Sequence, residues 1–411
     1  MPLEVIARRE RIAMADIREM GSKDDAAQLM YARLAGTHGQ PCVSVYTASF
    51  LSAIPAKADL DRLTRLVRSA CERFADASLT PDAAEELLKS CWHLLPSGNA
   101  VRAGTRALAV FLSDGFFECF QLPSPAAEFA VVGHEFHVRP LLAIVPEDDR
   151  FFLLAVSQKH VKLFQGSYSG LTERTVEAVP ENLHEDLSGR SFEKAYQSHT
   201  AASPLSHTKG AVFHGSHFNK KEEILHFLRS VDRGIANSLK DHRAPLIVAA
   251  VDYLFPIYKE ANTYPHLADS AIVGSPDLLS TNALHAAAWK VVEEQASKAR
   301  NSAFALYGEH VNTPLTSSNL RDVVLAASRG LVRFLFIPES GDRWGSIAQP
   351  DTVHLHASQE MGDDELLNLA AVLTLRHQGS VYVIPRAQLR EGADAAALFR
   401  FGLGSHAASA T

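Results

Sequence analysis

The sequence lacks the cysteine pairs by which zinc ribbons and thioredoxin-like sites are recognised. Its four cysteines, Cys42, Cys71, Cys91 and Cys119, stand singly in the first third of the chain. No Cys-x-x-Cys pair occurs, which excludes both kinds of site. We therefore expect buried, reduced thiols.

Long apolar runs are also missing. The first twenty residues mix charged with apolar side chains and contain no apolar core of a secretory signal. The longest apolar run, AVFLSDGFFECF, is too short and too interrupted to cross a bilayer. These features predict a cytoplasmic protein without membrane contact.

Loops that mark common enzyme classes are absent as well. The sequence has no Walker A loop, no G-x-G-x-x-G after a strand and no G-x-S-x-G elbow. His134-Glu135-Phe136-His137 lacks the spacing of H-E-x-x-H, and it falls in a segment that we predict to be extended. His134 and His137 would then point to opposite faces, so we expect no metal and no cofactor.

What is present is a chain long enough for several domains. It has 411 residues, with 46% hydrophobic and 21% charged residues, as in ordinary globular proteins. The net charge of −7 excludes a surface that is basic all over. Contact with nucleic acid would therefore need a local cluster of Lys and Arg.

Periodicity predicts a mixed α/β (α+β) chain with boundaries near residues 146 and 300. The N-terminal part alternates strands at Pro41–Ser49, Ala107–Leu112, Phe116–Gln121 and Phe129–Val132 with two helices, the second capped by Thr80. After the central part, helices and strands alternate from Asn319 to Phe401, which predicts a three-layer α/β sandwich. The predicted domains are residues 1–146, 147–300 and 301–404, followed by a disordered tail at 405–411.

The central part begins with the strand sequences FFLLAVS, VKLFQG and ERTVEAV. A helix from Lys220 to Leu239 follows, then the apolar strand APLIVAAV and a helical stretch from Ser280 to about Leu306. Three strands, a helix, a buried strand and a helix is the order of a ribonuclease-H-like domain.

The stretch from Ser198 to Arg243 has a net positive charge, although the chain as a whole is negative. Its only acids are Glu222, Glu223, Asp232 and Asp241. Against them stand Lys209, Lys220, Lys221, Arg229, Arg233, Lys240 and Arg243. These Lys and Arg side chains could equally belong to an ordinary solvated helix face that binds no partner. Free N–H groups and the positive dipole at the mouth of a helix favour an anion there, and Gly215 lets the backbone come close to a partner.

Aromatic residues follow this stretch. Tyr253, Phe255, Tyr258 and Tyr264 could stack on RNA bases. Their spacing favours packing at the corner between a strand and a helix.

Three stretches resemble the bacterial homologues of the archaeo-eukaryotic peptide-chain release factor and Pelota family. They are HVRPLLAIVPEDDRFFLLAVSQKHVKLFQG, VDYLFPIYKEANTYPHL and AAVLTLRHQGSVYVIPR with ALFRF after it. The resemblance implies a divergent N-terminal domain, a ribonuclease-H-like central domain and a C-terminal domain like ribosomal protein L7Ae. The architecture is similar to that of the ribosome hibernation factor Balon.

The family also implies a partner, the 70S ribosome. Its members occupy the A site, and a loop of the central domain reaches toward the rRNA of the peptidyl-transferase centre. The resemblance allows a translational GTPase as a further partner. Candidate ribosome-binding residues are Lys209, His214, Gly215, Ser216, His217, Lys220 and Lys221.

One departure from the family bears on chemistry. In release factors this loop carries Gly-Gly-Gln, and the Gln supports hydrolysis of peptidyl-tRNA. The matching stretch here is His214-Gly215-Ser216, and no Gln occurs between Gln197 and Gln295. We therefore expect no catalytic residues and a factor that binds idle or stalled 70S ribosomes without cleavage, in hibernation or rescue.

Two alternatives stay open. The first is a peptidyl-tRNA hydrolase in which His214 or His217 activates water. The second is a stress protein that keeps the fold but binds a ligand or metal, because His214 and His217 could ligate zinc.

Overall fold

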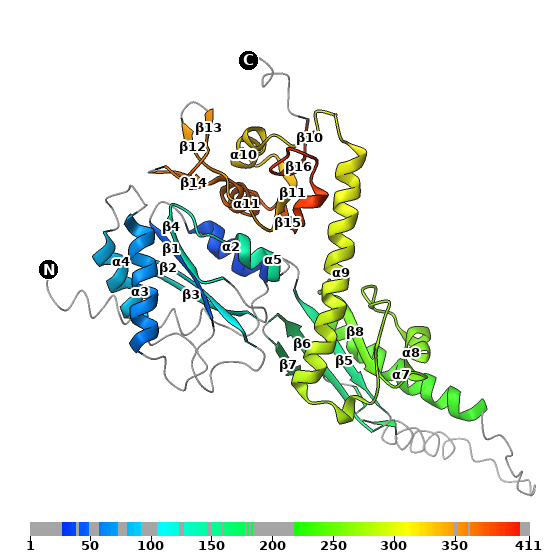
Figure 1. Ribbon diagram of the computed structural model, residues 1–411. Coiled ribbons are helices and arrows are strands. Elements are labelled where there is room, and N and C mark those ends of the chain that lie inside the picture. The colour runs from blue at the N-terminus through cyan, green and yellow to red at the C-terminus, as the bar shows by residue number, and fades with distance from the viewer. Residues whose placement is uncertain are drawn as a thin grey trace, which may run out of the picture. The chain divides into compact units, whose positions relative to one another are not determined.

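A computed structural model describes residues 27–37, 41–48, 57–72, 80–91, 105–122, 127–145, 149–157, 159–168, 170–176, 179–180, 182–183, 218–348, 352–360 and 362–402. The chain has the predicted mixed α/β fold (Figure 1). It divides into two compact units. Met1–Asp148 and Ala296–Thr411 together form the composite unit, and Asp149–Gln295 form the central unit. The three-domain division stays a prediction.

The N-terminal part of the composite unit is an antiparallel sheet with strand order β3-β2-β1-β4. Residues Leu63, Val67 and Leu88 of the two helices α3 and α4 pack on one face of it, as their helical spacing predicts. The Thr80 hydroxyl accepts a hydrogen bond from Ala83 N at 3.2 Å, which confirms the predicted cap. The elements are β1 (Cys42–Ala48), α3 (Lys57–Glu72), α4 (Pro81–Cys91), β2 (Ala107–Ser113), β3 (Phe116–Leu122) and β4 (Phe129–Gly133).

The other face of this sheet carries an aromatic cluster. The rings of Tyr46 and Phe136 both pack edge-on against Phe111. Two helices, α2 (Ala27–Gly36) and α5 (Arg139–Ile144), lie on this side, and the Tyr31 hydroxyl of α2 donates to Val145 O at 2.7 Å. Figure 1 shows the sheet between these two pairs of helices.

The predicted strand at His134–His137 is wrong. β4 ends at Gly133, which pairs with Cys42 at the start of β1, and among the described residues no strand pairs with the chain beyond Gly133. The backbone N–H of His137 donates instead to Ser44 Oγ at 2.9 Å, and the chain turns into α5.

The C-terminal part of the composite unit is the predicted three-layer sandwich. A sheet of order β10-β16-β11-β15 has α10 and α11 on one side. On its other side Tyr307, near the end of the long helix α9, packs with Phe336. A smaller sheet, β13-β12-β14, adjoins it. The elements are α9 (Thr281–Glu309), β10 (Thr316–Ser317), α10 (Leu320–Ser328), β11 (Val332–Pro338), β12 (Trp344–Ala348), β13 (Thr352–His356), β14 (Asp364–Glu365), α11 (Leu366–Arg376), β15 (Ser380–Ile384) and β16 (Ala396–Phe399).

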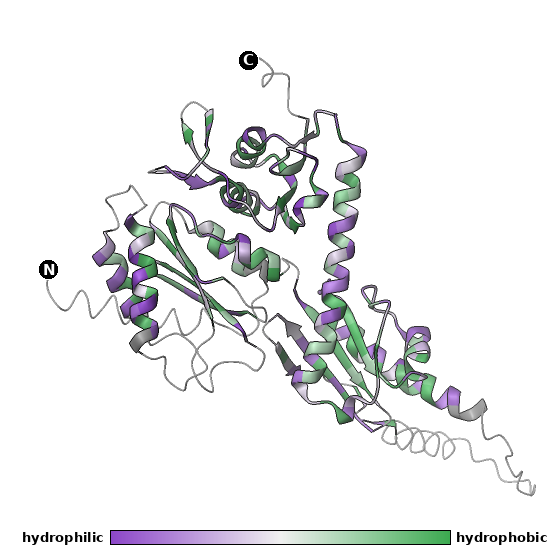
Figure 2. Ribbon diagram, in the orientation of Figure 1, coloured by the Kyte–Doolittle hydropathy of each residue, from purple (hydrophilic) through white to green (hydrophobic). Residues whose placement is uncertain are grey.

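The central unit is built on a five-stranded sheet of order β7-β6-β5-β8-β9. Its first three strands are antiparallel, and β8 and β9 continue it in parallel, which is the ribonuclease-H-like arrangement predicted from the element order. Figure 2 shows β5 and β8 as hydrophobic strands, as expected for strands covered on both faces. The elements are β5 (Phe151–Val156), β6 (Val161–Ser167), β7 (Gly170–Arg174), α7 (Phe218–Leu239), β8 (Leu246–Ala250), α8 (Leu254–Ala261) and β9 (Ile272–Val273).

The third strand of this sheet is not where the sequence predicts it. β7 runs from Gly170 to Arg174, whereas the predicted strand covers residues 173–179. The turn from β6 is tight and uses Gly170 at φ +137°, so pairing with β6 starts directly after it. The pairing ends at Arg174, opposite Leu163.

Candidate nucleic-acid interface

The predicted ribosome-facing loop lies largely outside the described residues. This holds for Lys209, His214, Gly215, Ser216 and His217. The helix that follows them is described, and α7 begins at Phe218, two residues before its predicted start. Lys220 is therefore in the first turn of α7, and Lys221 follows it on the helix surface.

The inner face of α7 explains its orientation. Ile224, Phe227, Leu228, Val231 and Ile235 are buried at the spacing of one helical face. They share a core with β5, β6, β8 and α8. Because this face is fixed against the sheet, the residues on the opposite side of α7 are exposed.

The outer face of α7 carries a line of cations. Arg229, Arg233 and Lys240 are all exposed, and Asn237 is the exposed residue between the last two. The spacing of four residues places Arg229, Arg233 and Asn237 on one side of α7. At 1.5 Å per residue, the two arginines are about 6 Å apart along the helix axis. The helix ends at Leu239, and Lys240 and Arg243 follow it directly. We call Arg229 and Arg233 of α7, together with the exposed Lys240 and Arg243 after the helix, the α7 basic stripe.

The cations of this stripe stand out by their lack of ion pairs within the described part of the chain. None of its four residues forms an ion pair there. Unpaired guanidinium groups present a planar fork of donors that matches phosphate oxygens. The stripe can therefore bind a polyanion without first breaking a salt bridge.

Two acids lie within the stripe's sequence: Asp241, between Lys240 and Arg243, is exposed, whereas Asp232 points inward. Asp232 is 2% exposed and accepts hydrogen bonds from Thr263 N at 2.9 Å and Thr263 Oγ1 at 2.7 Å. The Tyr258 hydroxyl also donates to it, at 3.4 Å. Burial raises the pKa of this carboxyl, and the hydrogen bonds from Thr263 and Tyr258 oppose the rise. The Asp232 side chain thus joins α7 to the end of α8 and is kept off the outer face.

At the beginning of α7, unlike in the stripe, the exposed cation has a carboxylate partner. Lys221 Nζ lies 3.7 Å from Glu260 Oε2, and both side chains are well exposed. Such a pair contributes little to stability, and an anion can replace the carboxylate. Lys221 remains available as a contact, but it is a weaker candidate than the stripe.

The aromatic residues after β8 mostly pack, as their spacing favours. Tyr258 and Tyr264 are buried, and Phe255 is half-buried beneath Lys259, whose Nζ lies 5.7 Å from the ring centre. Tyr253 differs, because 49% of it is exposed. It is the aromatic residue of this group that can stack on a base.

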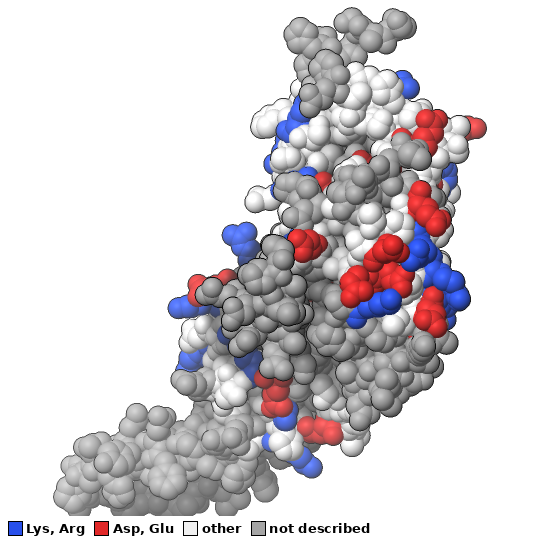
Figure 3. Space-filling view, turned by 90° about the vertical axis from the view of Figure 1, so that its left-hand side faces the viewer, with Lys and Arg blue, Asp and Glu red and all other residues white. Residues whose placement is uncertain are grey.

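Cations elsewhere are paired more often. On α3 and α4, Arg68 contacts Asp82 and Glu85 at 2.8 Å, and Lys89 contacts Glu85 at 2.6 Å. The view that faces these helices shows basic and acidic side chains intermixed (Figure 3). A solvated surface of this kind has no net attraction for phosphate. The α7 basic stripe is distinguished from it by the absence of carboxylate partners in the described structure.

The described residues offer little for metal or thiol chemistry. Among them, no group of three or more His, Cys, Asp or Glu side chains is arranged to hold a metal ion. The thiols of Cys42 and Cys71 are buried, as predicted, and burial raises their pKa to about 12 and about 11, whereas Cys119 is only partly buried. Across the described ranges, no helix is both long and apolar enough to cross a membrane.

Solved structures with a similar chain course include translation factors. Ribosome-bound archaeal Pelota is 13% identical, with 92% of this chain and 94% of that chain covered and a TM-score of 0.37. Pelota of Archaeoglobus fulgidus is 11% identical, with 92% and 93% covered and a TM-score of 0.30. Dom34 of S. cerevisiae, a translation termination-like factor, is 10% identical, with 71% and 75% covered and a TM-score of 0.33. Scores this low support no inference about function.

Sequence comparison is more specific. No curated protein matches the chain. Residues 151–294 match the model of bacterial archaeo-eukaryotic release factor family 7. This range covers nearly the whole central unit and contains α7 with its basic stripe. The match confirms the resemblance seen in the sequence: residues 151–294 of this chain are similar to bacterial archaeo-eukaryotic release factor family 7.

Proposed function

We propose that this protein is a release-factor-like and Pelota-like translation factor that binds the A site of idle or stalled 70S ribosomes. The observation that supports it most is the α7 basic stripe, which lies in the segment that matches a release-factor family. Ribosomal RNA is the polyanion that such a factor meets. Two unpaired cations on α7 and two directly after it suit several phosphates of one strand.

Contact without cleavage is the second part of the proposal. No Gln occurs between Gln197 and Gln295, so the glutamine of Gly-Gly-Gln is missing. The loop of Lys209 to His217 would reach the peptidyl-transferase centre, and the stripe behind it would hold the RNA backbone. A translational GTPase that delivers the protein remains part of this proposal.

The test is co-sedimentation of the purified protein with 70S ribosomes in sucrose gradients at several salt concentrations. We expect binding at low salt that weakens steeply as salt rises, because phosphate contacts release counterions. Arg229→Glu/Arg233→Glu/Lys240→Glu should reduce the affinity by about tenfold to a hundredfold and lower the slope of log affinity against log salt by about 2.

A matched control changes the same amount of charge elsewhere. Lys290 and Lys298 are exposed on α9, and Arg321 is exposed on α10. The Lys290→Glu/Lys298→Glu/Arg321→Glu variant should bind like the unchanged protein. If both triple variants lost the same affinity for the ribosome, the net charge of the protein, and not the position of the stripe, would explain the binding. No binding at low salt would contradict the proposal itself.

The absence of cleavage is tested separately. Peptidyl-tRNA in stalled ribosomes should remain intact over many minutes of single-turnover incubation with saturating protein. Release of the peptide, lost in His214→Ala, would instead establish the hydrolase alternative.

A further inference from the structure

An open groove lies inside the composite unit, beside the edge strand β4. Its volume is about 610 Å³, within the range of roughly 300–1,000 Å³ usual for small-molecule sites. One wall consists of apolar residues of β4 and α5, among them Phe129, Val131 and Ile144. The opposite wall comes from the segment after β11 and includes Asp342 and Trp344. We call this cavity the β4 groove.

His137 is the polar group most firmly placed in this groove. Its backbone is held on both sides, because its N–H donates to Ser44 Oγ at 2.9 Å and its carbonyl accepts from the Tyr46 hydroxyl at 2.7 Å. The Phe129 ring packs edge-on against the imidazole. Only 7% of the residue is exposed. Within the described residues its ring nitrogens have no hydrogen-bond partner, although the ring lines the groove.

The imidazole is neutral. Burial lowers the pKa of His137 to about 3, and the nearby Arg139 lowers it further, while Asp342 opposes this. A neutral ring has one nitrogen that donates and one that accepts. His137 therefore offers a ligand both kinds of hydrogen bond without a charge.

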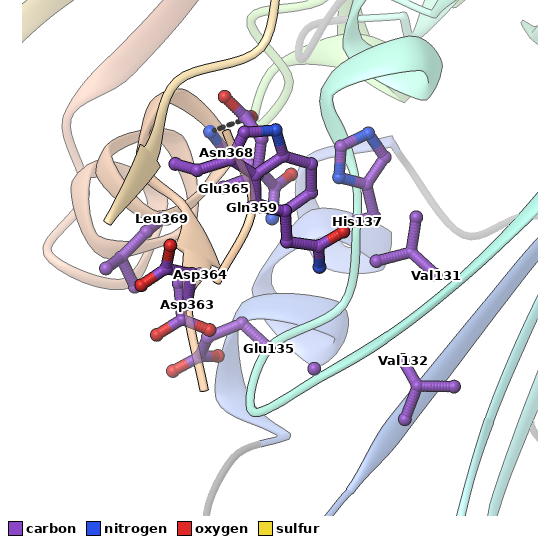
Figure 4. A pocket seen from close by; sticks show the side chains of 12 residues that line it. Val131, Val132, Glu135, His137, Gln359, Asp363, Asp364, Glu365, Asn368 and Leu369 are labelled. Carbon is purple, nitrogen blue, oxygen red and sulfur yellow. Dashed lines mark hydrogen bonds between the residues drawn. The ribbon is translucent and has the colours of Figure 1, made fainter. Parts of the chain in front are cut away.

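Two more uncharged polar groups reach the same space. Gln359 and Trp344 line the groove together with His137, and neither side chain has a hydrogen-bond partner among the residues described. Figure 4 shows the smaller pocket that adjoins the groove and shares these three residues with it; the His137 ring and the Gln359 amide both project into it. The amide offers a donor–acceptor pair, the indole a donor and the imidazole one of each, and Phe129 and Trp344 supply the aromatic carbocycles of the lining.

The charges around the groove exclude an anionic ligand. Arg139 is the basic residue of the lining, but its guanidinium already donates to Gly341 O at 2.9 Å and to Asp342 Oδ1 at 2.7 Å. It also lies 3.4 Å from Glu365 Oε2. Glu339 adds another carboxylate at the rim. A phosphate would meet these carboxylates without a free cation to balance them.

We infer that the β4 groove binds a free nucleoside or nucleobase. A planar heterocycle presents donors and acceptors at its edge for His137, Gln359 and Trp344, and its flat face can pack on the Phe129 ring. The carboxylates of Asp342 and Glu339 can accept hydrogen bonds from ribose hydroxyls, as acidic residues do in dinucleotide sites. A 5′-phosphate is disfavoured because these carboxylates would repel it.

The test is isothermal titration of the full-length protein with adenosine, guanosine, cytidine and uridine, and with each 5′-monophosphate. We expect one nucleoside to bind at one site per chain with a Kd of about 100 µM or tighter. Its monophosphate should bind at least about tenfold more weakly. Gln359→Ala should weaken nucleoside binding by about fivefold to tenfold, the effect of one or two lost hydrogen bonds. Trp344→Phe, which keeps a ring but removes the indole N–H, should weaken it by a similar factor.

Gln388→Ala is the matched control, since Gln388 is exposed in the same unit but does not line the groove. This variant should bind the nucleoside unchanged. The inference is overturned if no nucleoside binds at several millimolar to protein with an unchanged circular-dichroism spectrum. It is also overturned if the monophosphate binds more tightly than the nucleoside, or if Gln359→Ala and Gln388→Ala bind alike.

Discussion

At the scale of single residues, the burial of His137 makes the stability of the fold depend on pH. Its folded-state pKa is lowered from 6.5 to about 3, chiefly by burial. Above pH 6.5 the ring is neutral in both the folded and the unfolded chain, so it has no effect on stability there. As the pH falls below 6.5, only the unfolded chain takes up the proton, and the free energy of unfolding decreases.

We therefore predict that the composite unit loses about 2–3 kcal/mol between pH 7 and pH 4.5 through this residue, at about 1.4 kcal/mol per pH unit. The His137→Gln protein cannot take up this proton. Its free energy of unfolding should therefore fall by about 2–3 kcal/mol less over the same pH range. Urea unfolding of both proteins at pH 7 and pH 4.5 measures the difference. An identical loss in the two proteins would show that His137 titrates normally in the fold.

At the scale of elements, one side chain joins α11 to the segment between β4 and α5. Asn368 Oδ1 accepts from Val138 N at 2.8 Å and from Arg139 N at 3.2 Å, and its Nδ2 donates to Phe136 O at 2.9 Å. All of these groups are buried. The contact connects parts of the sequence about 230 residues apart.

Asn368→Ala should lower the free energy of unfolding by about 2–4 kcal/mol, because it leaves two buried N–H groups and a carbonyl without partners. Chemical unfolding of the composite unit measures the loss. Asn301→Ala is a suitable control, since Asn301 is exposed on α9, and its effect should stay within about 0.5 kcal/mol. Equal effects of the two substitutions would mean that the Asn368 contact is not made in solution.

At the scale of the whole molecule, the two units differ in how the chain forms them. The central unit is one continuous segment, and the buried residues of its two cores all come from residues 152–264 and 151–292. The composite unit needs both ends of the chain. Arg376 of α11 donates to Ala35 O and pairs with Glu135, each across more than 200 residues.

A fragment of residues 149–295 should therefore fold alone and unfold cooperatively on heating, followed by circular dichroism. A fragment of residues 1–148 should show no cooperative transition, because it lacks the partners supplied by α11. Cooperative unfolding of the second fragment would contradict this dependence. If the fragment of residues 149–295 showed no cooperative unfolding, the central unit would not fold independently.

Much of the fold follows from local patterns. The face of α7 with Phe227 and Val231, the cap at Thr80 and the apolar strand β8 are each decided by residues near one another in sequence. The prediction failed where pairing decided the outcome. β7 is set by its register against β6, and the segment His134–His137 is not a strand because β1 offers no partner there.

The sequence by itself determined the mixed α/β class, the ribonuclease-H-like order of the central elements and the reversal of charge around α7. These depend on composition and on periods of two and 3.6 residues, which are local. Only the tertiary structure decided that Arg229 and Arg233 lie exposed on one side of α7, because this depends on the face that α7 buries. It alone decided that Asp232 faces Thr263, and that His137 and Gln359, 222 positions apart, line one groove. Contacts between such distant residues leave no periodic trace in the chain.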